Sequence, residues 1–316
     1  MKRLLLILCC VALLAACSEE EKRPATAKAP ERYGLDWQLF GDVESLTVNS
    51  YNATTKFGEV VTEFDSATFY QFNADGDVTE CVIDLEESEG DIIGEGVKYE
   101  YNSDGKISRM VESTTYYDID NYEYTTAEDV TTYRYNAEGL CTQSILTYSH
   151  GESIKTTFKY DDKGRETEWR SYDSDGALDE VCKKGYDSKD NIIRQIYYNN
   201  DGSEKLCVTY KYDKRGKCIE RFSESDDWCT RYTYKYNSQG LMTAQREYDG
   251  DDEYALENEF RLKYNAAGAL IESQRISYGD LDTDVYDYKI TIDKHNNITR
   301  IDSYENGDII SVTEFD

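Results

Sequence analysis

Apolar and polar side chains alternate along most of this chain. Near residue 234, for example, the rings of Tyr232, Tyr234 and Tyr236 are separated by the polar residues Thr233 and Lys235. Alternation with a period of two places rings on one face of an extended strand and polar groups on the other. The pattern therefore predicts β-strands with one aromatic face.

A short motif recurs where these segments end: an aromatic or aliphatic residue, any residue, an aromatic residue, Asn or Asp, two residues, then Gly. Asn or Asp can accept hydrogen bonds from the backbone two residues on, and Gly supplies the positive φ that closes a short hairpin loop. Two degenerate copies have Asp190 or Asn296 at the glycine position, and these residue types tolerate a left-handed backbone. The copies, 24 to 34 residues apart, are Tyr70–Gly76, Tyr99–Gly105, Tyr133–Gly139, Phe158–Gly164, Tyr186–Asn191, Tyr210–Gly216, Tyr234–Gly240, Leu262–Gly268 and Ile292–Asn297.

A second alternating segment follows each turn, such as Ile192–Tyr198, and a looser acidic turn comes next. Because a lone hairpin is marginal in water, the units are expected to pair edge to edge. The sequence predicts an all-β protein in which tandem antiparallel β-hairpin repeats, residues 70–316, form one elongated or curved meander sheet. Whether that sheet is open or a closed shell stays undecided.

The first residues look like an export signal. Lys2 and Arg3 precede an apolar run that is too short to span a bilayer, and residues 1–16 are therefore predicted as a signal peptide. The run ends in Leu14-Ala15-Ala16-Cys17, which resembles the lipobox of bacterial lipoproteins. This resemblance implies that Cys17 is acylated and anchors the chain to a membrane. The alternative is an ordinary cleaved signal with an incidental cysteine.

Residues 17–33 are predicted as a flexible acidic tether, and residues 34–69 as an N-terminal cap that uses Trp37, Leu39, Phe40 and Val43. The cluster Ser18-Glu19-Glu20-Glu21-Lys22 resembles the signal that sends lipoproteins of Bacteroidota to the outer face of the outer membrane. It implies a lipid-anchored, surface-exposed protein. A solvated tether accounts for the same residues.

The chain carries 35 Lys and Arg against 64 Asp and Glu, a formal net charge of −29. This charge repels phosphate backbones and anionic headgroups, so nucleic acid is excluded as a partner and membrane contact must come from the lipid. Six cysteines follow Cys17, and in an oxidising compartment they form disulfides or pack as small apolar residues. They are Cys81, Cys141, Cys182, Cys207, Cys218 and Cys229.

The repeat resembles that of YD-repeat, or RHS-type, proteins, whose units run Tyr-Asp-x-x-Gly, an alternating strand, then Asp-Gly. Tyr160-Asp161-Asp162-Lys163-Gly164, followed by Asp175-Gly176, matches this unit, as does Tyr212-Asp213-Lys214-Arg215-Gly216. The repeats here are longer and less regular, and Asn often replaces Asp. The resemblance implies a repeat lipoprotein of the cell envelope and a carbohydrate-binding candidate.

Trp169 and Trp228 are the candidate ligand-binding residues, because an indole ring can stack on a sugar. Packing of the same rings within the sheet is the alternative. Asp173 and Asp175 are weak candidates for calcium, since carboxylates cluster there in a turn, although no loop has the full EF-hand spacing. No other cofactor is expected.

The function expected from these features is a non-catalytic binding or envelope-interaction module with a glycan or protein ligand. A periplasmic structural scaffold is the first alternative. A glycan-degrading enzyme is the second, because such enzymes use pairs of carboxylates and this chain is rich in them. The chain contains no G-x-S-x-G or H-E-x-x-H motif.

Overall fold

The computed structural model describes residues 43–85, 92–118, 123–250, 255–279 and 283–316. The predicted signal peptide, Cys17, the tether and the cap residues Trp37, Leu39 and Phe40 lie outside these ranges. No helix among the described residues is long and apolar enough to cross a membrane.

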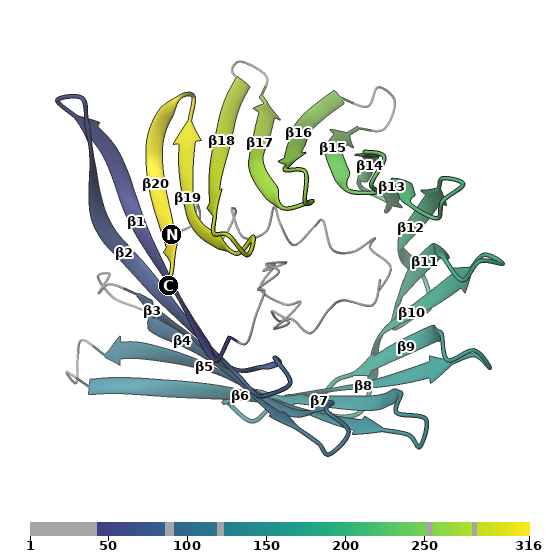
Figure 1. The fold of residues 1–316 in the computed structure, drawn as a ribbon. Coiled ribbons are helices and arrows are strands. Elements are labelled where there is room, and N and C mark those ends of the chain that lie inside the picture. The colour runs from purple at the N-terminus through teal and green to yellow at the C-terminus, as the bar shows by residue number, and fades with distance from the viewer. Residues whose placement is uncertain (1–42, 86–91, 119–122, 251–254, 280–282) are drawn as a thin grey trace. The chain divides into compact units, whose positions relative to one another are not determined.

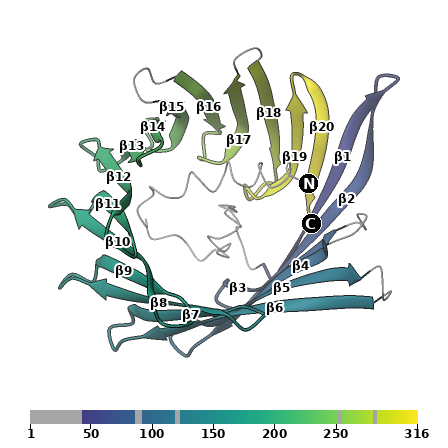
Figure 2. The same cartoon turned by 180° about the vertical axis from the view of Figure 1, so that it is seen from behind.

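The described chain is built from β-strands, which confirms the predicted fold class (Figures 1 and 2). The strands are β1 (Ser45–Lys56), β2 (Glu59–Phe72), β3 (Val78–Leu85), β4 (Ile92–Tyr101), β5 (Ile107–Asp118), β6 (Glu123–Tyr135), β7 (Cys141–Thr147), β8 (Ser153–Tyr160), β9 (Glu166–Tyr172), β10 (Leu178–Tyr186), β11 (Ile192–Asn199), β12 (Glu204–Tyr212), β13 (Cys218–Glu224), β14 (Cys229–Tyr236), β15 (Met242–Asp249), β16 (Ala255–Tyr264), β17 (Leu270–Tyr278), β18 (Thr283–Ile292), β19 (Ile298–Glu305) and β20 (Asp308–Phe315).

The chain divides into two compact units. One contains residues 1–89, 234–246 and 256–316, and the other contains residues 90–233 and 247–255. In the second unit, β4 to β14 form an antiparallel meander in which each strand pairs with the next along the chain. Val97 and Val208 are buried in this unit. The predicted meander of hairpins is confirmed here.

The first unit contains a pairing that a simple meander lacks. Strands β16 to β20 follow one another, but β20 then pairs with β1, and β1 continues through β2 to β3. Val48 lies opposite Phe315, and both side chains are buried. The first and last strands are therefore neighbours, and neither is a free edge where they pair.

The nine motif copies lie at nine turns, each between an even-numbered strand and the odd-numbered strand that follows. In the turn at Asn102, the side-chain oxygen accepts hydrogen bonds from the backbone of Asp104 (2.9 Å) and Lys106 (3.0 Å). Gly105, with φ of 72°, donates from its backbone to the carbonyl of Asn102 at 3.0 Å. Asp190 and Asn296 also have positive φ, 70° and 69°. The predicted turn chemistry is confirmed.

The tyrosine that precedes Asn or Asp links neighbouring repeats. In four repeats its hydroxyl donates a hydrogen bond to the backbone carbonyl of the previous repeat, two residues after the positive-φ residue. These bonds join Tyr135 to Ile107 (2.7 Å), Tyr160 to Cys141 (2.7 Å), Tyr186 to Glu166 (2.5 Å) and Tyr212 to Ile192 (2.7 Å). These tyrosine side chains therefore link neighbouring hairpins of the sheet by hydrogen bonds.

Residues 45–69, which were predicted to belong to a cap, form β1 and most of β2. They pair with β20 and β3 and thus belong to the sheet itself. Val43, the described member of the expected apolar cluster, is half-buried. The motif-free sequence of β1 carries no sign that its partner lies at the other end of the chain.

Candidate binding site around Trp228

Trp228 lies at the end of a tight loop, Ser225–Trp228, that connects β13 to β14. The backbone amide of Ser225 donates to the carbonyl of Trp228 at 2.9 Å, and the Ser225 hydroxyl donates to the same oxygen at 3.3 Å. This closed loop holds Trp228 at the end of the hairpin, and 46% of the residue is exposed. An indole so exposed leaves apolar surface for a ligand to cover.

Trp228 lines an open pocket of about 280 Å³ together with residues at the end of β11 and the start of β12. The rest of the lining consists of residues whose side chains donate or accept hydrogen bonds. The other lining residues are Asn199, Glu204, Lys205, Ser225, Asp226 and Asp227. The pocket therefore offers one aromatic surface and a polar surround, a composition suited to a ligand with many hydroxyl groups.

The β11–β12 side of the pocket is held by its own hydrogen bonds. Asp201 accepts from the backbone amide of Ser203 at 2.8 Å and from its hydroxyl at 2.6 Å, and these bonds lower the pKa of Asp201. The Asn199 side-chain amide donates to the Ser203 hydroxyl at 2.9 Å. The loop is thus ordered without help from a ligand, which reduces the entropy that binding would cost.

The pocket has a negative charge balance. Glu204, Asp226 and Asp227 contribute three carboxylates, and Lys205 contributes the single ammonium group. Lys205 forms an ion pair with Glu180 at 2.8 Å, and this hydrogen bond raises the pKa of Lys205. Because the lysine charge is already paired, the pocket repels anionic ligands and suits neutral or cationic ones.

Trp169, the other predicted platform, lies in a different environment. It is half-buried in β9, where it is opposite Phe158 on one side and Cys182 on the other. Its ring packs edge-on against Tyr197, with 6.0 Å between centroids. Trp169 does not line the Trp228 pocket. The structure therefore separates the two tryptophans into one packed ring and one exposed ring.

Asp173 and Asp175 lie in the β9–β10 turn. The Asp173 carboxylate accepts hydrogen bonds from the backbone amides of Asp175 (3.0 Å) and Ala177 (2.8 Å), as Asn102 does in its own turn. No group of three or more His, Cys, Asp or Glu residues that could hold a metal ion is found within the described ranges. Asp173 has a structural role here, and calcium binding stays a prediction.

The six cysteines after Cys17 are all free thiols. Cys81, Cys182, Cys218 and Cys229 are buried, and Cys141 and Cys207 are half-buried. Burial raises the pKa of Cys81 and of Cys182 to about 11 in each case. Of the two alternatives left open by the sequence, the structure has the packed cysteines and no disulfide among these six.

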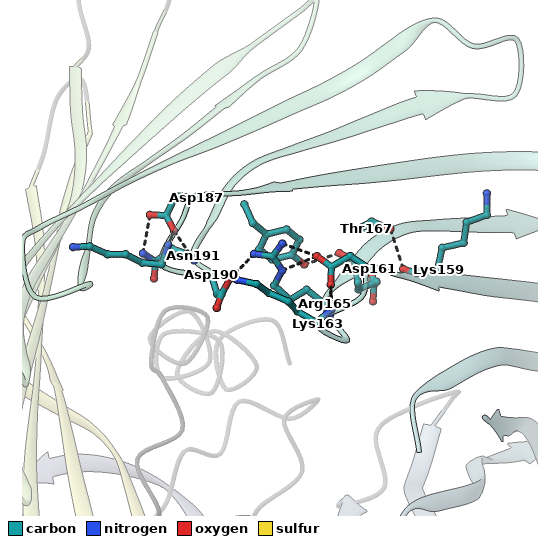
Figure 3. Close-up of polar contacts among 11 residues, drawn as sticks. Lys159, Asp161, Lys163, Arg165, Thr167, Asp187, Asp190 and Asn191 are labelled. Carbon is teal, nitrogen blue, oxygen red and sulfur yellow. Dashed lines mark hydrogen bonds and ion pairs between the residues drawn. The ribbon is translucent and has the colours of Figure 1, made fainter. Parts of the chain in front are cut away.

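Sequence reasoning missed a cluster of charges between two neighbouring turns (Figure 3). Lys163 and Arg165 both reach the Asp190 carboxylate, at 2.7 and 2.6 Å, and Arg165 also binds Asp161 at 2.6 Å. Hydrogen bonding from Lys163 lowers the pKa of Asp190. Arg165 lies over the ring of Tyr186, 4.6 Å from its centroid. The cluster joins the turns of β8–β9 and β10–β11 and has no free anion-binding group.

Comparisons with known proteins leave the family open. A family model described as "Uncharacterised protein" matches residues 121–227. No curated protein matches the chain. Among solved structures, a porin-like protein from Bacteroides uniformis is similar with 13% identity and a TM-score of 0.41, covering 86% of this chain and 96% of that chain.

Proposed function

We propose that this protein is an outer-membrane lipoprotein, anchored through Cys17 at the cell surface, whose repeat array is a non-catalytic glycan-binding module. The exposed indole of Trp228, set among hydrogen-bonding side chains in a pocket of about 280 Å³, supports this proposal most directly. An indole face stacks on the C–H groups of a sugar ring, and carboxylates and amides bind its hydroxyls.

The charge of the pocket limits the classes of glycan that it can bind. Glu204, Asp226 and Asp227 accept hydrogen bonds from hydroxyl or ammonium groups, and they repel the carboxylates of uronic acids. We therefore expect a neutral or amino-sugar glycan. These residues lie where an odd-numbered strand connects to the next even-numbered one, at the strand ends opposite the nine motif turns.

Binding is tested by calorimetric titration with neutral, amino-sugar and uronic-acid oligosaccharides. Trp228→Ala is expected to weaken binding at least tenfold, and Trp228→Tyr to retain part of it, because the phenol ring still offers a stacking face. Trp169→Phe is the matched control and should bind like the parent. Equal binding by Trp228→Ala would reject the pocket as the glycan site.

The proposed location has its own test. Protease treatment of intact cells should remove an epitope placed in the repeat array while a periplasmic marker survives. Protection of the epitope until the outer membrane is broken would favour the periplasmic scaffold instead. Shortened oligosaccharides after incubation with the pure protein, lost in Glu204→Gln or Asp227→Asn, would favour the glycan-degrading enzyme.

A further inference from the structure

The hairpin of β1 and β2 extends beyond the strands that flank it. The two strands pair with each other from Ser45 opposite Gln71 to Lys56 opposite Glu59. In contrast, β20 covers β1 only from Val48 to Asn52, and β3 covers β2 only from Ser66 to Phe72. We call residues 54–63 the finger. In both views its tip stands apart from β20 (Figures 1 and 2).

The finger ends in exposed apolar side chains. Phe57 is fully exposed at the turn, Val60 is 53% exposed and Val61 is 43% exposed. Val60 and Val61 are consecutive in a strand, so their side chains point to opposite faces of the hairpin. Ala53, just below the finger, is already buried against Ile309 and Val312. Each face of the finger therefore carries an exposed apolar side chain that the sheet does not cover.

The backbone at the tip gives a second reason to regard Phe57 as functional. Phe57 and Gly58 are the two central residues of the turn, with φ of 56° and 85°. A turn with positive φ at both positions favours Asn-Gly, and a bulky residue at the first position is strained. An aromatic ring is thus unfavourable here for the backbone and for solvation. Backbone strain of this kind is typical of residues that have a functional contact with a ligand or a partner.

We propose that the finger inserts into the bilayer leaflet to which Cys17 is anchored. This inference rests on the lipid anchor of the proposed function. A protein partner with a flat surface would cover one face of the hairpin, whereas lipid surrounds an inserted tip and covers both faces. Three residues of each strand reach about 10 Å, which matches the depth at which interfacial segments lie among headgroups and upper acyl chains.

The position of the finger in the chain and its charges agree with this occupant. Ser18 to Glu44, 27 residues, separate the anchor from β1, so the finger hairpin is the first described element after the lipid. Tethering raises its local concentration at the bilayer. Lys56 lies opposite Glu59 beside the turn, so the two opposite charges enter the interface as a pair together with Phe57. The acidic chain repels anionic lipid, so insertion should favour zwitterionic bilayers.

Vesicle co-sedimentation of the chain from residue 17 onward, with Cys17→Ser to remove the acyl chains, tests the finger alone. The parent is expected to bind phosphatidylcholine vesicles and to bind phosphatidylglycerol vesicles less.

Phe57→Asn should weaken binding about tenfold, because a buried aromatic side chain contributes at least that factor. Asn favours the turn, so the variant should melt at the same temperature or higher. Phe69→Thr, which removes a 44% exposed ring outside the finger, should bind like the parent.

Three results would overturn the proposal: no binding of the parent to either vesicle, unchanged binding by Phe57→Asn, or capture of a protein by a photo-crosslinker at position 57 in intact cells. A lipid adduct at that position would support it. Glycan titration of Phe57→Asn keeps the two proposals apart, because the Trp228 pocket is unaltered in this variant. Separately, release of the acylation-deficient Cys17→Ala chain from membranes reports on the anchor.

Discussion

The phenolic hydroxyl of Tyr212 donates a 2.7 Å hydrogen bond to the backbone carbonyl of Ile192, in the preceding repeat. Tyr135, Tyr160 and Tyr186 form the same bond with their own preceding repeats. The ring therefore has two roles, since its face covers the sheet while its hydroxyl joins one hairpin to the next. This bond explains why the residue is tyrosine in these repeats when phenylalanine would cover the sheet equally well.

Removing this hydroxyl should destabilise the repeat. We expect Tyr212→Phe to lower the free energy of unfolding by about 1 kcal/mol, because one half-buried carbonyl loses its donor. Urea denaturation followed by circular dichroism measures the change. Tyr124→Phe, which alters a residue that is 62% exposed, is the control and should change little. Equal stability of Tyr212→Phe and the parent would mean that the carbonyl finds water instead.

The positive φ of the motif glycine should matter more than the space around it. A Cβ at Gly216 meets no atom within 4 Å, but φ is 85°. We expect Gly216→Ala to cost about 1 to 2 kcal/mol from the left-handed backbone alone. Gly185, within β10, has ordinary φ, and a Cβ there contacts Arg194 at 4.0 Å. Gly185→Ala should therefore be neutral or stabilising by up to about 1 kcal/mol. Equal effects of the two substitutions in thermal unfolding would contradict this explanation.

Glu259 should make stability depend on pH. It is buried, and burial alone would raise its pKa, but hydrogen bonds from Arg261 and Arg246 lower the pKa below the ordinary value of 4.5. A carboxyl whose pKa is lowered by folding stabilises the fold at pH values above its ordinary pKa. This contribution is lost as the pH falls through the lower, folded-state pKa. We expect Glu259→Gln to lose about 1.5 to 3 kcal/mol at pH 7.

The loss caused by Glu259→Gln should shrink as denaturation is repeated at pH values below 4.5, because the parent then loses the same charge. Glu272→Gln removes an exposed carboxylate paired with Lys263 and serves as the control, with little effect expected at any pH. A constant difference between Glu259→Gln and the parent from pH 7 to pH 3 would show that ionisation of Glu259 is unimportant.

Buried thiols should resist alkylation. Burial raises the pKa of Cys81 and Cys182 to about 11, so at pH 8 almost none of either thiol is the reactive thiolate. Iodoacetamide should modify both only after urea is added, as peptide mass spectrometry would show. Rapid modification of Cys81 in the native protein would indicate that β2 and β3 open locally.

The sequence predicted the structure best where the role of a residue depends only on its near neighbours in the chain. Alternation identified the strands, and the Asn or Asp and Gly of each motif copy identified nine turns, including those where Asp190 or Asn296 takes the glycine position. These features depend on neighbours a few residues away. The inter-repeat hydroxyl bonds of the tyrosines were not predicted, because a ring on a sheet face explains an aromatic pattern without them.

The candidate binding site was only partly predictable. Trp169 and Trp228 were chosen together, yet Trp169 belongs to an alternating strand segment whereas Trp228 follows Ser-Asp-Asp in a turn. That local difference was a usable sign that one ring is packed and the other exposed. The other pocket walls, such as Asn199 and Glu204, come from the adjacent hairpin. Their convergence depends on strand order, which a single motif does not encode.

The pairing of β1 with β20 determines when folding can finish. Val48 and Phe315 are 267 residues apart, and contacts across so long a stretch form slowly because the chain between them must first be ordered. Until they meet, β1 and β20 expose unpaired backbone that can pair with other chains. The chain thus depends on its last strand to remove two aggregation-prone edges at once.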